Sequence, residues 1–174
     1  LTSATIENNG HIGVSAFENS FAQCGNDSKV DILNPSYIGE SAFKGCTRLV
    51  TANLLNNGNV GDKAFQNCTS LAYLTLGENV DSLGNFAFDN CASLKEFSIP
   101  NHIPSMGEYC FRRCTGLKKM VIGTGIEVLQ RGTFKNCTSL TDMSVGVNVK
   151  SIQNSVFNNC SSLPAIHIPQ ATKN

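Results

Sequence analysis

Cysteine is the residue type whose number and spacing first suggest a chemical role in this sequence. Eight cysteines occur among 174 residues, and such a set could ligate a metal, form disulfides or supply a nucleophile. Zinc ligands usually come in pairs a few residues apart, whereas seven of these cysteines recur at intervals of 22 or 23 residues. They are Cys24, Cys46, Cys68, Cys91, Cys114, Cys137 and Cys160, and Cys110 stands outside the series.

This regular interval favours a structural role, in which the cysteines form a column of small apolar side chains that face inward. Side chains in such a column point the same way, whereas a disulfide needs bond vectors that converge. Cys110 occupies a position at which other repeats have alanine, as Ala87 shows, so it is predicted to be a small core residue. We therefore expect reduced, mostly buried cysteines, no metal site and no cofactor.

The remaining reactive side chains do not assemble into a catalytic set. His11, His102 and His167 fall at unrelated positions of the sequence repeat, so register brings no histidine next to a nucleophile. The glycines recur with the turns and form no phosphate-binding loop before a helix. The best set in adjacent repeats is Tyr73, Glu96 and Lys119, and we predict that the chain is not an enzyme.

Phenylalanine spacing reveals the elements that position these residues. After most repeat cysteines, long apolar residues follow at the third, sixth and eighth positions, as Leu71, Leu74 and Leu76 follow Cys68. Asp27 and Ala52 depart from this pattern. The last two alternate with polar residues, which predicts a short strand with one buried face. The repeat is about 23 residues long, as shown by Phe17, Phe43, Phe65, Phe88, Phe111, Phe134 and Phe157.

A turn of the form G-x-x-A-F-x-x-C connects each strand to the next, and one such unit has too little apolar surface to fold alone. Stacked units bury a continuous core, so we predict a solenoid shaped like a horseshoe, with a parallel sheet on the concave side. Short turns, 3-10 turns or helical turns should line the convex side. We expect eight strands, one per turn, the last at Ile166–Ile168, and a four-residue insertion in the first turn around Glu18 to Phe21, where Phe21 precedes Cys24.

The combined string I-G-x-x-A-F-x-x-C-x-x-L-x-x-L-x-I-P resembles the BspA-like class of leucine-rich repeats. It is visible from Ile38 to Leu49 and again from Phe88 to Pro100, and the resemblance covers nearly the whole chain. It implies a leucine-rich repeat solenoid, and it also implies a cell-surface or secreted protein that binds host-matrix or microbial surface proteins.

The exposed positions of the predicted sheet vary from turn to turn while the core positions stay constant. A constant core under a variable polar face is typical of a protein-recognition module, although a solvated sheet has the same appearance. We predict a non-enzymatic module that binds a protein through the concave face, and the alternative is a structural spacer with no ligand of its own. The predicted ligand-binding residues are Tyr73, Thr75, Lys95, Glu96, Ser98, Lys118, Lys119, Val121, Asp142, Ser144 and His167.

Charge is balanced overall, with 13 basic and 13 acidic residues, so no nucleic acid or anionic membrane is required as a partner. Residues 1–93 carry four basic and nine acidic side chains (net −5), residues 94–135 carry seven and three (net +4), and residues 136–174 carry two and one (net +1). Arg112 and Arg113 are expected on the convex side and Lys118 and Lys119 near the sheet, which argues against one continuous nucleic-acid stripe. The sequence contains no apolar run of eighteen residues, so no segment is predicted to span a bilayer.

The ends of the chain suggest that residues 1–174 are a single domain cut from a longer array. Neither end has the polar cap that a solenoid needs, and the alternative is end-to-end self-association of the acidic half with the basic half. The motif N-x-S/T occurs at Asn26, Asn67, Asn136 and Asn159. These asparagines are either glycosylated or simply the residues of the repeated turn.

Overall fold

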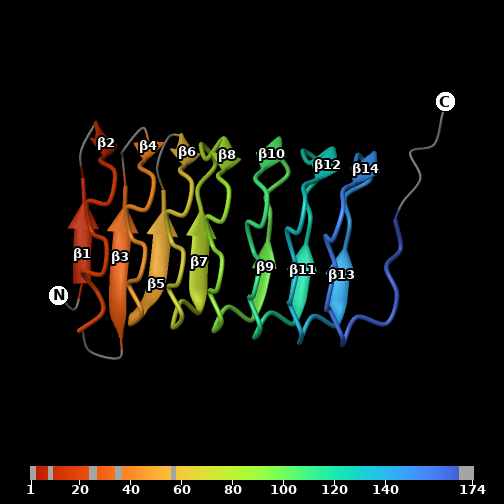
Figure 1. The fold of residues 1–174 in the computed structure, drawn as a ribbon. Coiled ribbons are helices and arrows are strands. Elements are labelled where there is room, and N and C mark those ends of the chain that lie inside the picture. The colour runs from red at the N-terminus through yellow and green to blue at the C-terminus, as the bar shows by residue number, and fades with distance from the viewer. Residues whose placement is uncertain (1–2, 8–9, 24–26, 34–36, 56–57, 169–174) are drawn as a thin grey trace.

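The computed structural model of the chain describes residues 3–7, 10–23, 27–33, 37–55 and 58–168. These residues wind into a solenoid in which each turn carries one longer strand and one two-residue strand, and every strand pairing is parallel (Figure 1). The predicted solenoid with a parallel sheet is therefore confirmed. The described residues contain no helix that could span a membrane.

The strands form two lines along the solenoid. The longer strands are β1 (Ser3–Ile6), β3 (Ser28–Ile32), β5 (Leu49–Leu54), β7 (Tyr73–Leu76), β9 (Glu96–Ser98), β11 (Lys119–Val121) and β13 (Asp142–Ser144). The two-residue strands are β2 (His11–Ile12), β4 (Tyr37–Ile38), β6 (Asn59–Val60), β8 (Ser82–Leu83), β10 (Ser105–Met106), β12 (Val128–Leu129) and β14 (Ser151–Ile152).

The predicted count of eight strands, one per turn, is wrong in two respects for the described residues. The apolar residue before each phenylalanine belongs to a second line of strands, and the segment 165–168 forms no strand. In the two preceding turns, Lys118 and Thr141 donate their backbone N–H to the turn before them. Pro164 occupies the same position, and it has no N–H to donate.

A stack of phenylalanine rings runs through the core. Consecutive rings from Phe17 to Phe157 lie 5.0–5.9 Å apart between centroids and within 14° of parallel. Phe17, rather than Phe21, holds the first position of this stack. Phe17 is half-buried, whereas Phe21 is fully buried, and the Phe21 ring is tilted by 46° and lies 6.5 Å from that of Phe43. The insertion in the first turn therefore adds a fully buried ring beside the half-buried Phe17.

Each turn reverses its direction through two residues with positive φ, which lie two positions before and two positions after the phenylalanine. Asparagine and glycine tolerate this left-handed conformation best, which explains why the later position is Asn or Gly in every described turn but one. Because these residues interrupt any helical run, the described turns are short turns, the first of the three predicted forms, and contain neither a 3-10 nor an α-helical segment. The earlier position holds Ser15, Ser41, Lys63, Phe86, Tyr109, Gly132 and Ser155, and the later one holds Asn19, Gly45, Asn67, Asn90, Arg113, Asn136 and Asn159.

Neither line of strands is continuous. The longer strands divide into a four-stranded sheet, β1-β3-β5-β7, and a three-stranded sheet, β9-β11-β13, while the two-residue strands divide between β10 and β12. In three successive turns, Leu33, Leu55 and Gly77 donate an N–H to the carbonyl of the turn before. Pro100 follows them at the same position and cannot donate. One hydrogen bond between β7 and β9 is therefore impossible, and we call this boundary the seam.

Candidate functional site on the longer strands

The outward side chains of the longer strands form the surface that we call the long-strand face. Strand register aligns Thr51 with Tyr73 on one side of the seam, and it aligns Lys119 with Glu96 and Asp142 on the other side. The register thus aligns the equivalent exposed positions of successive turns within each sheet. The longer strands form two parallel sheets rather than one, because β7 and β9 are not paired in the described structure.

Most of the predicted binding residues are exposed. Tyr73 has the largest exposed fraction among the large hydrophobic side chains on the strands, at 68%. Val121 is half-buried, and His167 is exposed but lies in the segment that forms no strand. The other exposed members are Thr75, Lys95, Glu96, Ser98, Lys118, Lys119, Asp142 and Ser144.

Charged side chains of the long-strand face pair with one another in part. Lys119 Nζ lies 3.3 Å from Asp142 Oδ2, and Lys29 Nζ lies 2.9 Å from Asp31 Oδ2. A hydrogen bond from Asn53 and a second one from Lys29 lower the pKa of Asp31. Within the described part of the chain, neither Lys95 nor Glu96 takes part in an ion pair.

A pocket of about 360 Å³ opens at the seam, lined by Ala72, Tyr73, Lys95 and Glu96. It brings together a phenol from β7, a carboxylate from β9 and an ammonium from the residue before β9. Such a set can bind an aromatic or apolar group together with polar groups of either charge. The seam therefore places three of the predicted binding residues around one hollow.

The cysteine column has the structural role that its spacing predicts. Seven cysteines are described, and all are buried and free of disulfides; Cys24 lies outside the described residues. The thiols of six donate to the phenylalanine carbonyl of the preceding turn, as Cys68 Sγ does to Phe43 O at 3.1 Å. Burial raises the pKa of the Cys91 and Cys114 thiols well above the ordinary value, which disfavours the thiolate that a nucleophile or metal ligand needs.

The described residues contain no group of three or more His, Cys, Asp and Glu side chains that could hold a metal ion. Tyr73, Glu96 and Lys119, which we considered as a reactive set, come from three successive turns, and the seam separates the first from the other two.

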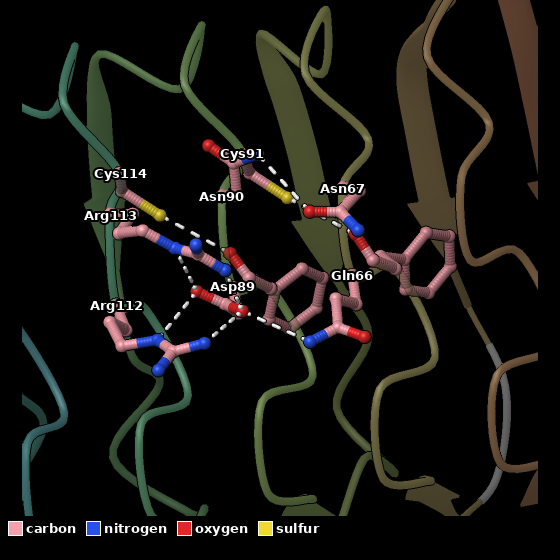
Figure 2. A network of polar contacts seen from close by, with 10 residues as sticks. Gln66, Asn67, Asp89, Asn90, Cys91, Arg112, Arg113 and Cys114 are labelled. Atoms are coloured by element: carbon pink, nitrogen blue, oxygen red, sulfur yellow. Dashed lines mark hydrogen bonds and ion pairs between the residues drawn. The ribbon is translucent and has the colours of Figure 1, made fainter.

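The sequence analysis did not identify a buried carboxylate on the turn side of the solenoid, the side formed by the turns around the repeated phenylalanines. Asp89 is fully buried, and it accepts two hydrogen bonds from Arg112, two from Arg113 and one from Gln66, at 2.8–3.2 Å (Figure 2). Burial raises the pKa of Asp89, but the hydrogen bonds from the arginines and from Gln66 outweigh this effect and lower the pKa below the ordinary value. Gln66, Asp89 and Arg112 each follow a repeat phenylalanine, so alignment of that column would have revealed the contact.

The described asparagines of the N-x-S/T motifs each pair with the asparagine at the same position of a neighbouring turn, which for Asn67 is Asn90, outside any such motif. Asn90 Nδ2 donates to Asn67 Oδ1 at 3.1 Å, and Asn159 Nδ2 donates to Asn136 Oδ1 at 2.9 Å. These bonds and the positive φ values account for asparagine at these positions as turn residues. Asn26 lies outside the described residues.

Comparison with known proteins places this repeat among characterised folds. The family model for the BspA type leucine rich repeat region matches residues 14–141 and 58–174, with six copies. The search of curated proteins gave no match.

Several solved structures share the fold. A leucine-rich repeat protein of Treponema pallidum is 24% identical with a TM-score of 0.82, over 94% of this chain and 78% of that chain. One from Bacteroides ovatus is 25% identical with a TM-score of 0.68, over 97% and 49%. A leucine-rich cell surface protein of Faecalibacterium prausnitzii is 20% identical with a TM-score of 0.78, over 95% and 47%. The chain therefore spans about half the length of the last two.

The repeat pattern, the stacked turns and these matches agree. Leucine-rich repeat proteins are protein-interaction or structural modules and are generally not enzymes. The chain belongs to the BspA-type leucine-rich repeat family.

Proposed function

We propose that this chain is a protein-recognition module of a cell-surface or secreted protein, and that it binds a protein ligand through the long-strand face. The observation that carries the proposal is the pocket at the seam, where the exposed Tyr73 ring stands beside Lys95 and Glu96. The break between β7 and β9 coincides with Tyr73, the most exposed aromatic side chain on the described strands. We therefore expect a ligand to bind at this position.

The physical chemistry of the face fits a protein partner. Tyrosine is enriched among the residues that dominate protein interfaces, because it buries a large ring and keeps a polar end. Glu96, Lys119 and Asp142 follow one another in register, which gives an alternating charge pattern that a partner can match. A ligand with an apolar group for the pocket and the opposite charge pattern beside it would bind best.

Two observations support a location at the cell surface. The family consists of leucine-rich repeat proteins of the BspA type, and one structural neighbour is described as a cell surface protein. A host-matrix protein or a microbial surface protein is therefore the class of ligand that we propose.

The test is a binding screen of immobilised host-matrix and microbial surface proteins. Exchange of the charges in the double variant Lys119→Asp, Asp142→Lys should abolish binding of any protein captured by the wild type, and Tyr73→Ala should weaken it at least tenfold. The matched control is Glu40→Lys, Lys63→Glu. It exchanges an exposed ion pair in the turns that precede the phenylalanines, in which Lys63 Nζ lies 2.9 Å from Glu40 Oε1. Equal loss in both double variants would contradict the proposal.

The alternative is a structural spacer that presents neighbouring domains. The ion pairs Lys29–Asp31 and Lys119–Asp142 favour it, because a face whose charges satisfy one another is also stable as a plain solvated surface. If no protein of the screen binds, and Tyr73→Ala and the charge exchange leave every measured property unchanged, the spacer is the better description.

A further inference from the structure

The seam differs from other turn boundaries in its backbone hydrogen bonds. In three other turns, the residue that precedes the longer strand donates its N–H to the carbonyl of the equivalent residue one turn earlier. These bonds run from Ala72 N to Val50 O at 2.9 Å, from Lys118 N to Lys95 O at 2.7 Å and from Thr141 N to Lys118 O at 3.0 Å. The same register predicts a bond from Lys95 N to Ala72 O across the seam.

This bond is absent from the described structure, and so is its neighbour. Within the described residues, Lys95 N and Glu96 N donate to no acceptor, and Ala72 O accepts no donor. One turn later, the corresponding nitrogens of Lys118 and Lys119 both donate to Lys95 O, at 2.7 and 3.2 Å. The three unpaired groups belong to residues that line the pocket at the seam. A ligand in this pocket therefore meets two N–H donors and one carbonyl acceptor.

The side chains around the pocket are also free to interact with a ligand. The ring of Tyr73 is 68% exposed, and it stacks on no other ring in the described part of the chain. Lys95 and Glu96 are exposed, and neither forms an ion pair among the described residues. Glu96 thus adds a second acceptor, beside Ala72 O, and Tyr73 adds an apolar surface.

This combination of donors and acceptors discriminates between ligand groups. A carboxylate has only acceptors to offer, so it would leave Ala72 O unpaired and would be repelled by Glu96. An ammonium group has only donors, so it would leave the two N–H groups unpaired and would be repelled by Lys95. A purely apolar group would cover all three backbone groups without replacing their hydrogen bonds to water, which is costly.

A primary carboxamide satisfies every group, because its oxygen accepts two hydrogen bonds and its nitrogen donates two. We propose that the seam pocket binds the side-chain carboxamide of a glutamine or asparagine of the protein ligand. The carboxamide oxygen accepts from Lys95 N and Glu96 N, its nitrogen donates to Ala72 O and the Glu96 carboxylate, and its methylene groups pack on the Tyr73 ring. This inference rests on the proposed function, because it names the group that a protein ligand inserts at the seam.

The test titrates the isotope-labelled protein with hydrocinnamamide, in which two methylene groups join a primary carboxamide to a phenyl ring. The backbone amide NMR signals of Lys95 and Glu96 should shift and saturate. Hydrocinnamate, phenylpropylammonium and N,N-dimethylhydrocinnamamide carry a carboxylate, an ammonium group and an amide without N–H, and each should bind about fivefold or more weakly. Unchanged signals of Lys95 and Glu96, or equal binding of any of these three compounds, would overturn the proposal.

Variants connect this binding to the pocket. Tyr73→Ala should weaken hydrocinnamamide binding roughly fivefold or more, because the ligand loses the ring on which it packs. Glu96→Gln removes the charge that repels a carboxylate, so the preference for hydrocinnamamide over hydrocinnamate should fall about threefold or more.

The matched control is Glu108→Gln, which removes an exposed carboxylate outside the seam pocket. It should change the preference by less than about twofold, because solvent and salt screen a distant exposed charge. An equal fall of the preference in Glu96→Gln and Glu108→Gln, or full hydrocinnamamide binding by Tyr73→Ala, would contradict the assignment to this pocket.

Failure of this inference and failure of the proposed function have different signatures. The titration needs no protein ligand, so a negative titration overturns the carboxamide site even if the screen captures a protein. A positive titration with an empty screen supports the carboxamide site and contradicts the recognition module. For a protein that the screen captures, saturating hydrocinnamamide should weaken binding at least about fivefold. Undiminished binding would show that the protein does not use the seam pocket.

Discussion

The repeated phenylalanine holds the turns together with both its ring and its carbonyl group. The ring of Phe65 stacks between those of Phe43 and Phe88. Its carbonyl accepts the backbone N–H of Cys68 in its own turn and the thiol of Cys91 in the next. Cysteine suits this position because its side chain is small and apolar and carries a weak donor.

Replacement of a middle phenylalanine should be costly. Phe88→Ala or Phe111→Ala is expected to lower the free energy of unfolding by about 3–5 kcal/mol, because both rings are fully buried within the stack. Tyr73→Ala should change it by less than about 0.5 kcal/mol, since that ring is largely exposed. Denaturant unfolding monitored by circular dichroism measures both, and equal losses would refute the assignment of Tyr73 to the surface.

Asp89 should make stability depend on pH in the acid range. Its pKa is lowered in the folded protein, so its contribution is fully present above the pKa of an unfolded aspartate, about 3.9. The contribution is lost as the pH falls through the lower folded pKa. Asp89→Asn should therefore cost about 1–3 kcal/mol at pH 7, and the difference from wild type should shrink between about pH 4 and pH 2.

Unfolding measured at a series of pH values tests this expectation. Asp142→Asn is the matched control, because its partner Lys119 and Asp142 itself are both exposed and such pairs contribute little. A destabilisation by Asp89→Asn that is the same at pH 7 and pH 2 would show that the carboxylate does not act through its charge.

At the scale of the element, glycine allows the two-residue strands to approach one another. A Cβ added to Gly107 would lie 2.5–2.8 Å from backbone atoms of Gly84 and Asn85 in the turn before. In the following turn Gln130 takes this position, and there β12 does not pair with β10. Pairing resumes between β12 and β14. There Gln153 takes the same position one turn later, so its neighbour in the turn before is Gln130 and not a glycine.

Gly107→Ala should therefore separate β10 from β8 and cost about 1–3 kcal/mol, the usual range for overpacking. Gly13→Ala is the control, because nothing lies within 4 Å of a Cβ added at Gly13. Thermal unfolding compares the two variants, and hydrogen exchange at the Gly107 amide, which donates to Leu83 O, reports the pairing directly. Equal melting temperatures for both variants would contradict this account of the glycines.

The sequence contained enough information for the columns of the solenoid but not for every element. Phe and Cys recur at one interval, so the buried stack and the exposed strand positions followed directly. A two-residue strand such as β6 is too short to show alternation, so the second line of strands was missed. The seam depends on the missing N–H of Pro100, which the repeat pattern treats as an ordinary strand end. Asp89 was missed because the residue after each repeat phenylalanine changes in type from turn to turn, so this column was not aligned, although Arg112 lies one repeat away.

At the scale of the whole molecule, charge is distributed unevenly along the solenoid. Residues 1–93 carry nine acidic and four basic side chains, and residues 94–135 carry three and seven. We expect the acidic part of one molecule to attract the basic part of another, so that the average mass rises with protein concentration at low salt and falls as salt screens the charges. Sedimentation velocity across both series measures this. A monomer at high concentration and low salt would exclude such self-association.

The two interruptions of the strand ladders occur at different turn boundaries. Where β7 and β9 separate, β8 and β10 remain paired, and where β10 and β12 separate, β9 and β11 remain paired. At each of these two boundaries, one pair of strands therefore still connects the neighbouring turns. The stack of phenylalanine rings also continues across both boundaries. Under tension along its axis the molecule can open locally at the seam or at the β10–β12 boundary, while a continuous mechanical link is kept between the two ends of the described array.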